Sequence, residues 1–236
     1  MSDLDPKEVL RDARQCVKSR DYPAALEKYI WFHDHALDVD RNWVGVRLSY
    51  AVSEWADLGE LYPPALAALE MVRDTKISTL IKGDGDSSLF HDVMAINRAL
   101  GREDSTLELF KVIAEADRRL AEKCFRVALE SIVSASEWGL ARSFIPDAVV
   151  EVDRFAMPFK SSLTNTASTS KELKADIFVR IYVKNIGLIL RILLETGDEI
   201  EARRVRQYAI DCIADEQIRD MVIERLSPSP PPMSIQ

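Results

Sequence analysis

The chain has 236 residues, of which 47% are hydrophobic, so it can bury a sizeable core and is not an intrinsically disordered protein. Its 39 acidic and 31 basic residues give a formal net charge of -8, which opposes binding to nucleic acid through bulk attraction. The three cysteines Cys16, Cys124 and Cys212 lie far apart and form no CxxC pair or disulfide framework, which favours a reducing compartment.

The N-terminal sequence MSDLDPKEVL begins with acids and lacks the apolar core of a secretory signal. We therefore expect a cytoplasmic protein. The first predicted helix runs from Pro6 to about Ser19, because Asp5 can cap its start and Glu8 can reach back to the cap.

Two nearly identical sequences, YPAAL at 22–26 and YPPAL at 62–66, indicate a repeated structural unit. Proline fits the first turn of a helix, where its missing amide hydrogen has no cost, so each sequence predicts a helix start. Each is preceded by another predicted helix, at 6–19 and at roughly 41–59. The unit is thus a helical hairpin, in which Ala25 and Ala65 permit close packing of its second helix.

The same pattern of small residues recurs at Thr106, Ala141 and Ala202, which gives successive intervals of 40, 41, 35 and 61 residues. Apolar residues also repeat every three or four positions through most of the chain, so the predicted fold is all-α with about five hairpins. The last interval contains an insertion, visible as the polar segment SSLTNTASTS at 161–170. Such periods are typical of stacked helical pairs that are stable only through their neighbours.

The hairpins resemble the tetratricopeptide repeat family over most of residues 6–215. The resemblance is degenerate: the small residue of the first helix is kept only at Ala13, and the intervals exceed the usual length of about 34 residues. WADLGELY at 55–62 matches the family's W-x-x-L-G-x-x-Y. That alignment, however, places two prolines inside a helix, where each would destabilise the helix by about 3 kcal/mol. The alanine-based alignment is preferred, because it puts the following residues on one apolar face: Val44, Leu48, Ala51, Trp55 and Leu58.

The resemblance implies a right-handed superhelix of antiparallel hairpins, forming a single domain over residues 1–226. The apolar segment at 177–194 is long enough to suggest a membrane span, but Arg180, Lys184 and Arg191 interrupt it, so we predict a buried helix. The proline-rich sequence at 227–236 predicts an extended, disordered tail, with a proline ligand for another domain as the alternative.

Candidate catalytic and metal-binding motifs are weak. On a helix His33 and His35 point about 200 degrees apart, so they cannot share an ion. A site that combines His33, Asp34, His91 and Asp92 from different helices is a remote alternative, which would make the protein a metal-dependent hydrolase. The loop at 82–92 lacks the glycine and the closing glutamate of a calcium loop. We therefore predict a protein that is not an enzyme and that uses no metal or cofactor.

In proteins similar to this one, the first helix of each hairpin lines a concave groove that binds a peptide or a partner helix. The positions aligned with that groove are mainly basic, whereas acids lie mainly on second helices, so we expect an acidic partner and neither nucleic acid nor membrane. The predicted binding residues are Arg14, Trp43, Arg47, Tyr50, His91, Arg98, Lys123, Arg126, Lys184 and Arg191.

The predicted function is thus a non-catalytic protein-interaction module, an adaptor or a scaffold. The alternative is an acidic neutralising protein, comparable to an immunity protein, that binds a basic partner through its convex face. The oligomeric state and the identity of the partner stay open.

Overall fold

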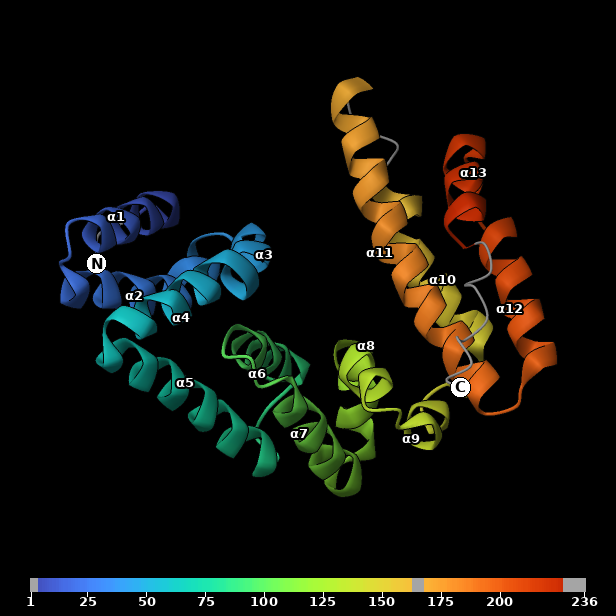
Figure 1. The fold of residues 1–236 in the computed structure, drawn as a ribbon, viewed down its shortest axis with the longest axis horizontal. Coiled ribbons are helices and arrows are strands. Elements are labelled where there is room, and N and C mark those ends of the chain that lie inside the picture. The colour runs from blue at the N-terminus through green and yellow to red at the C-terminus, as the bar shows by residue number, and fades with distance from the viewer. Residues whose placement is uncertain (1–3, 163–167, 227–236) are drawn as a thin grey trace, which may run out of the picture. The chain divides into compact units, whose positions relative to one another are not determined.

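The computed structural model describes residues 4–162 and 168–226, with side chains described for 4–157 and 175–226. Every regular element in these ranges is a helix, and they contain no β-strand (Figure 1). The all-α prediction is therefore confirmed. The predicted tail at 227–236 lies outside the described residues.

The chain divides into two compact units, unit 1 at Met1–Ser131 and unit 2 at Ile132–Gln236. The predicted single domain over 1–226 stays a prediction. Unit 1 contains these helices: α1 (Pro6–Lys18), α2 (Tyr22–Val39), a 3₁₀ turn η1 (Arg41–Trp43), α3 (Val44–Val46), a π-helical turn η2 (Arg47–Ala51), α4 (Val52–Leu61), α5 (Pro63–Ile81), α6 (Ser87–Ala99), α7 (Glu103–Ala116) and most of α8 (Arg118–Ser134).

The proline-marked helix starts are correct. Pro6, Pro23 and Pro63 lie in the first turns of α1, α2 and α5. The predicted cap at Asp5 is present as well, because its carboxylate accepts a hydrogen bond from the amide of Lys7 at 2.9 Å. Local sequence thus decides where these helices begin.

Consecutive helices of unit 1 pack as pairs: α1 on α2, α4 on α5, and α6 on α7. The pairs are also in contact with each other, since α2 packs on η2 and α4, and α5 packs on α6. The small residues predicted at these contacts, Ala25, Ala65 and Thr106, are all almost completely buried. Small side chains at these positions let neighbouring helices approach closely, so that each pair covers the apolar face of the next.

The segment before α5 departs from the predicted single helix at 41–59. It begins with η1 and α3, widens into the π turn η2, and becomes regular only in α4. Leu48, Ala51, Trp55 and Leu58 form the predicted buried stripe, whereas Val44 is largely exposed. The apolar pattern therefore identified the buried face but did not indicate the π turn.

In unit 2 the helices after α8 have the following bounds: α9 (Trp138–Ser143), α10 (Ala148–Ser162), α11 (Ser168–Glu195), α12 (Glu199–Asp211) and α13 (Glu216–Arg225). The additional element in the long last interval is α10, which packs on α11 and α12. The polar segment predicted at 161–170 overlaps the end of α10 and the start of α11, and residues 163–167 lie outside the described ranges. Among the described residues, no helix combines the length and the apolar character needed to cross a membrane.

Gly59 sets the distance between α4 and α5. A Cβ at this position would lie 2.9 Å from the Cβ of Leu66 and 3.1 Å from its Cα, which is too close. Beside this contact, the indole nitrogen of Trp55 donates a hydrogen bond to the carbonyl of Ala65 at 2.9 Å. The WADLGELY segment thus packs two helices together, although it does not follow the family's alignment.

We expect Gly59→Ala to lower the free energy of unfolding by about 1–3 kcal/mol, because the added methyl group forces α5 away from α4. Gly45, whose Cβ would meet nothing within 4 Å, provides the matched control. Gly45→Ala should raise stability by about 0.5–1 kcal/mol through helix propensity. Chemical denaturation of both variants measures the difference, and two equal effects would contradict the proposed close contact.

Candidate functional site

Arg47, predicted to bind a partner, instead points into unit 1 and is only 7% exposed. Its Nη1 and Nη2 donate to the two carboxylate oxygens of Asp92 at 2.5 and 2.9 Å, and its Nε donates to the carbonyl of His33 at 2.6 Å. The reason is its position four residues before Ala51, which puts it on the buried stripe of the helical segment. The assignment of Arg47 to an exposed binding groove is therefore wrong.

Two further side chains complete the environment of Arg47. Lys76 donates to Asp92 Oδ2 at 2.7 Å, and Arg47 Nη2 lies 3.1 Å from His33 Nε2. The resulting buried ion cluster consists of one residue each from α2, η2, α5 and α6: His33, Arg47, Lys76 and Asp92. Burying a charge costs free energy unless the charge is paired and hydrogen-bonded. Arg47 and Lys76 can therefore be buried here only because the carboxylate of Asp92 pairs with both.

Protonation states within the buried ion cluster follow from its geometry. Burial lowers the pKa of His33 to about 3, and the positive charge of Arg47 acts in the same direction. Burial alone would raise the pKa of Asp92, but hydrogen bonds from Arg47 and Lys76 outweigh it and hold the pKa below its usual value. Because a guanidinium only donates, His33 Nε2 is the acceptor and the single imidazole proton lies on Nδ1, which has no hydrogen-bond partner among the described residues.

The alternative metal site does not match this arrangement. His33 and Asp92 are close together, but the guanidinium of Arg47 binds both and occupies the position an ion would need. Asp34 is exposed, on a different side of α2 from the buried His33. In the described part of the chain, no group of three or more histidine, cysteine or acidic side chains is arranged to hold an ion.

Tyr50 is the exposed counterpart of Arg47, with 69% of its surface accessible. It lies on the same π turn, and the carbonyl of Leu48 beside it accepts a hydrogen bond from Arg98 of α6 at 3.0 Å. Glu54 follows one turn later and binds Arg14 of α1, with Nε donating at 3.0 Å and Nη2 at 2.9 Å. These contacts join α1, the η2–α4 segment and α6 into one surface, the Tyr50 face: Arg14, Tyr50, Glu54 and Arg98.

The other predicted binding residues of unit 1 differ in exposure. Trp43 is half-buried and packs edge-on against Phe32, with ring centroids 5.7 Å apart. His91 is also half-buried, and burial lowers its pKa. Lys123 and Arg126 are exposed on α8. The structure therefore links Arg14 and Arg98 to the helical segment that carries Tyr50, and it assigns Trp43 mainly to packing.

In unit 2, both predicted binding residues are exposed on α11. These are Lys184 and Arg191, and the Arg191 guanidinium lies 5.0 Å from the ring centroid of Trp138. They belong to a separate compact unit, so they are not counted in the Tyr50 face.

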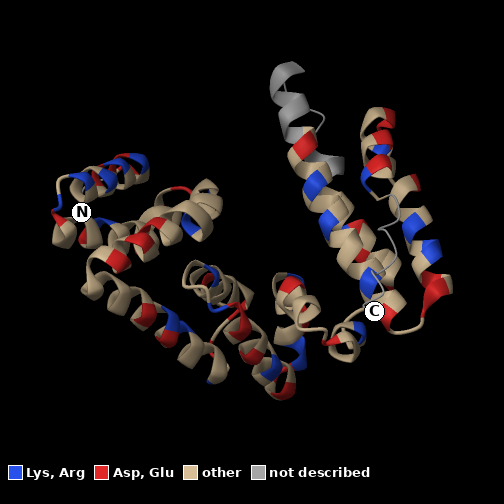
Figure 2. Ribbon diagram, viewed as in Figure 1, with Lys and Arg blue, Asp and Glu red and all other residues tan. Residues whose placement is uncertain are grey.

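Charge is distributed unevenly over the helices of unit 1. In Figure 2, lysines and arginines are frequent on α1, whereas α7 carries mainly acids. Several acids are exposed on the second helices of the pairs: Glu27, Asp34 and Asp38 on α2, Asp74 on α5, and Glu103, Asp104, Glu108 and Glu115 on α7. Acids thus gather on α2 and α7, but the first helix α4 carries only acids as well, so the predicted separation of charge by helix stays a prediction.

Comparisons with protein-family models, with curated proteins and with solved structures find no match for this chain. The case for the site therefore depends on geometry and chemistry alone.

Removing the buried carboxylate should be strongly destabilising. We expect Asp92→Asn to lower the free energy of unfolding by about 3–5 kcal/mol, because Arg47 and Lys76 then repel each other without a counter-charge. Glu8→Gln, which breaks the exposed ion pair with Arg11, should cost about 1 kcal/mol or less. A similar small cost for both variants in denaturant titrations would show that the buried ion cluster contributes little.

His33 should make stability depend on pH. The unfolded chain takes up a proton near pH 6.5, whereas folded His33 resists protonation down to about pH 3. Stability from this group is therefore greatest above pH 6.5 and is lost as pH falls, at up to about 1.4 kcal/mol per pH unit. His33→Gln, which keeps an acceptor for Arg47 but does not titrate, should flatten this slope in unfolding measured between about pH 7 and pH 4.5. Parallel curves for the variant and the original protein would contradict the assignment.

Proposed function

We propose that this protein is a non-catalytic interaction module, a tetratricopeptide-like superhelix whose Tyr50 face binds an acidic peptide or partner helix. The observation that carries the proposal is a large aromatic side chain, 69% exposed, on a helical segment to which two neighbouring helices each bind an arginine. Tyrosine and arginine are the residue types that most often dominate protein interfaces. Here they lie on helices, which hold them in a defined arrangement before a partner arrives.

The energies of the available contacts are sufficient for a moderate affinity. A hydrogen bond to a charged group contributes about 1.5–3 kcal/mol when partly desolvated. Arg14 is already paired with Glu54 in an exposed position, so exchanging that pair for a partner's carboxylate costs only about 0–1 kcal/mol. Burial of the Tyr50 ring adds a further apolar contribution, and together these reach a micromolar complex, at about 8 kcal/mol. Arg47 contributes nothing directly, because its donors are already used inside the unit.

Peptides selected for binding from a random displayed library provide the test. We expect the selected peptides to contain acidic and apolar residues. The variant that combines Tyr50→Ala with Arg98→Glu should bind the tightest of these peptides about tenfold or more weakly, and its affinity should depend less on salt concentration. Lys82→Glu, an equal kind of charge change at the exposed residue that follows α5, is the matched control and should have little effect. Affinities from fluorescence anisotropy at low and high salt give the result, and an unchanged affinity in the double variant would overturn the proposal.

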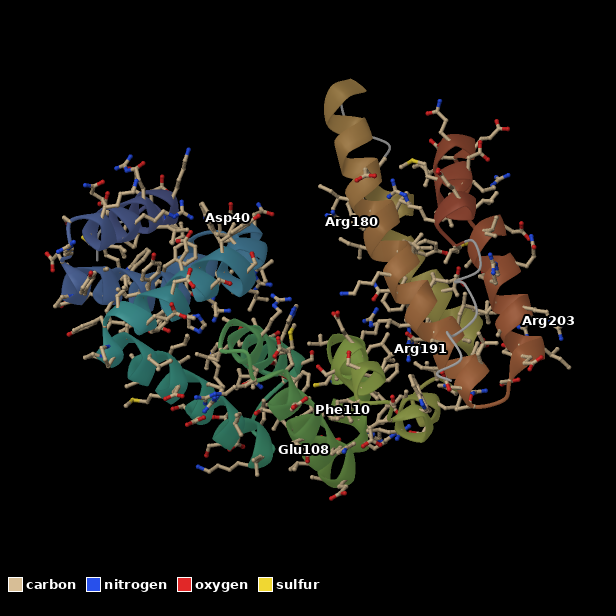
Figure 3. All side chains as sticks on the ribbon, viewed as in Figure 1. Asp40, Glu108, Phe110, Arg180, Arg191 and Arg203 are labelled. Carbon is tan, nitrogen blue, oxygen red and sulfur yellow. The ribbon has the colours of Figure 1, made fainter. Side chains whose placement is uncertain are left out.

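A basic partner that binds the second helices is the second candidate, favoured by the exposed acids of α7. Figure 3 shows Glu108 and Phe110 on this helix; Glu108 is exposed, whereas Phe110 is completely buried. In this case the selected peptides would be basic. Glu108→Lys with Asp104→Lys would then abolish binding, and changes on the Tyr50 face would not.

A further inference from the structure

Unit 2 carries a second exposed surface on its longest helix, α11. One side of α11 is buried against α10, α12 and α13, and there Tyr182 donates a hydrogen bond to the carbonyl of Ala209 at 2.8 Å; α9 contacts α11 as well. The opposite side combines apolar and basic residues, and we name it the α11 outer face: Ile177, Arg180, Ile181, Lys184, Arg191 and Leu194. Ile177, Lys184 and Arg191 recur every seven residues and form one row along the helix; Arg180 and Ile181 lie on either side of this row, and Leu194, three residues after Arg191, lies beside its end.

The apolar members of the α11 outer face are unusually accessible for aliphatic side chains. Ile181 is 51% exposed and Leu194 is 55% exposed, and both lie near exposed cations. The face extends over about 26 Å of helix at 1.5 Å per residue, which equals roughly two to three heptads of a packed helix pair. Its shape and length therefore suit a second helix lying along it.

One positive charge of this face, that of Arg191, is held in a defined position. The Arg191 guanidinium lies over the ring of Trp138, a cation–π contact at 5.0 Å, and is 3.9 Å from Glu195 on its own helix. Asp176, the acid nearest the other end, is already bound by Arg225 of α13 at 2.6 Å. Arg180 and Arg191 project from α11 in Figure 3, whereas Arg203 projects from α12. The outer face is thus apolar with an excess of positive charge.

We propose that the α11 outer face binds an acidic amphipathic helix of another protein. The aliphatic residues of such a helix cover Ile177, Ile181 and Leu194, while its carboxylates pair with the intervening cations. The charge of the face selects against a basic helix, because such a helix would bring like charges close together. This surface belongs to unit 2 and does not depend on the Tyr50 face of unit 1.

An anionic membrane is the other surface that attracts a basic amphipathic helix, but the arrangement of residues favours a protein. Membrane-bound helices bury a continuous apolar face and keep their cations on the polar side. Here Lys184 and Arg191 lie in the same row as Ile177, so insertion would bury their charges. A partner helix can instead place a carboxylate opposite each one.

The test uses the full chain and a synthetic amphipathic peptide of about three heptads with leucines on one face and glutamates beside them. Fluorescence anisotropy should detect binding, and Arg180→Glu with Lys184→Glu should weaken it by about tenfold or more. Arg203→Glu with Arg204→Glu makes the same change of charge on exposed α12 and should alter affinity by less than about twofold. Unchanged melting temperatures in both double variants show that they are folded.

Further measurements separate this inference from the proposed function. Binding should persist in the Tyr50→Ala, Arg98→Glu variant, because that variant leaves α11 intact. Loss in that variant alone would place the peptide on unit 1 and overturn the α11 assignment while supporting the proposed function.

A peptide with lysines in place of the glutamates should not bind, and equal binding of the two peptides would contradict charge selection. Stronger association with phosphatidylserine vesicles than with the acidic peptide would also overturn the proposal, in favour of a membrane surface.

Discussion

A buried guanidinium imposes the strictest physical requirement on unit 1. Arg47 cannot leave water without partners, and these come from two neighbouring helices: the carbonyl and imidazole of His33 on α2 and the carboxylate of Asp92 on α6. Lys76 on α5 adds a third helix to the cluster, because it binds the same carboxylate. A cluster of this kind is directional, unlike apolar packing, because a small rotation of any helix breaks a hydrogen bond. It therefore fixes the rotation of the η2–α4 segment about its axis.

The exposure of Tyr50 is a consequence of that rotation. With Arg47 held inside, the π turn places Tyr50 on the outside, and Arg98 of α6 binds the neighbouring carbonyl of Leu48. Single π turns inside α-helices occur frequently at functional sites, since the wide turn redirects side chains that a regular helix would place elsewhere. The cations near this surface thus have different roles: Arg47 orients the helix, Arg98 holds its backbone, and Arg14 remains at the surface with an exchangeable partner.

The two proposed surfaces have related chemistry although they lie in different units. Each combines an exposed apolar or aromatic group with a guanidinium that the protein itself holds in place, by the Leu48 carbonyl in one case and by the Trp138 ring in the other. Holding a long cationic side chain before binding reduces the entropy lost when a partner's carboxylate arrives. An interaction module gains both affinity and selectivity from this arrangement, since its positive charge disfavours partners of the same sign.

Much of the helical framework follows directly from local signals in the sequence. Proline in the first turn of α5, the aspartate cap of α1 and small residues such as Ala25 act over a few residues, so they remain informative without knowledge of the rest of the chain. The added helix α10 was missed, because the intervals between small residues record only that extra chain is present. Its own buried stripe, at Ala148, Val152 and Ala156, was the signal that could have revealed it.

What only the tertiary structure decided is which charged side chains are buried. Arg47 lies four residues before Ala51, at the edge of an apolar stripe, a position that brings it near the core but from which a long side chain can still turn outward into water. The deciding residue is Asp92, 45 positions further along the chain, together with Lys76. Desolvation penalties depend on what surrounds a group in space, whereas helix starts and apolar periodicity depend on neighbours along the chain. For that physical reason the sequence alone determined several helix starts and the apolar packing faces, and the fold determined the site.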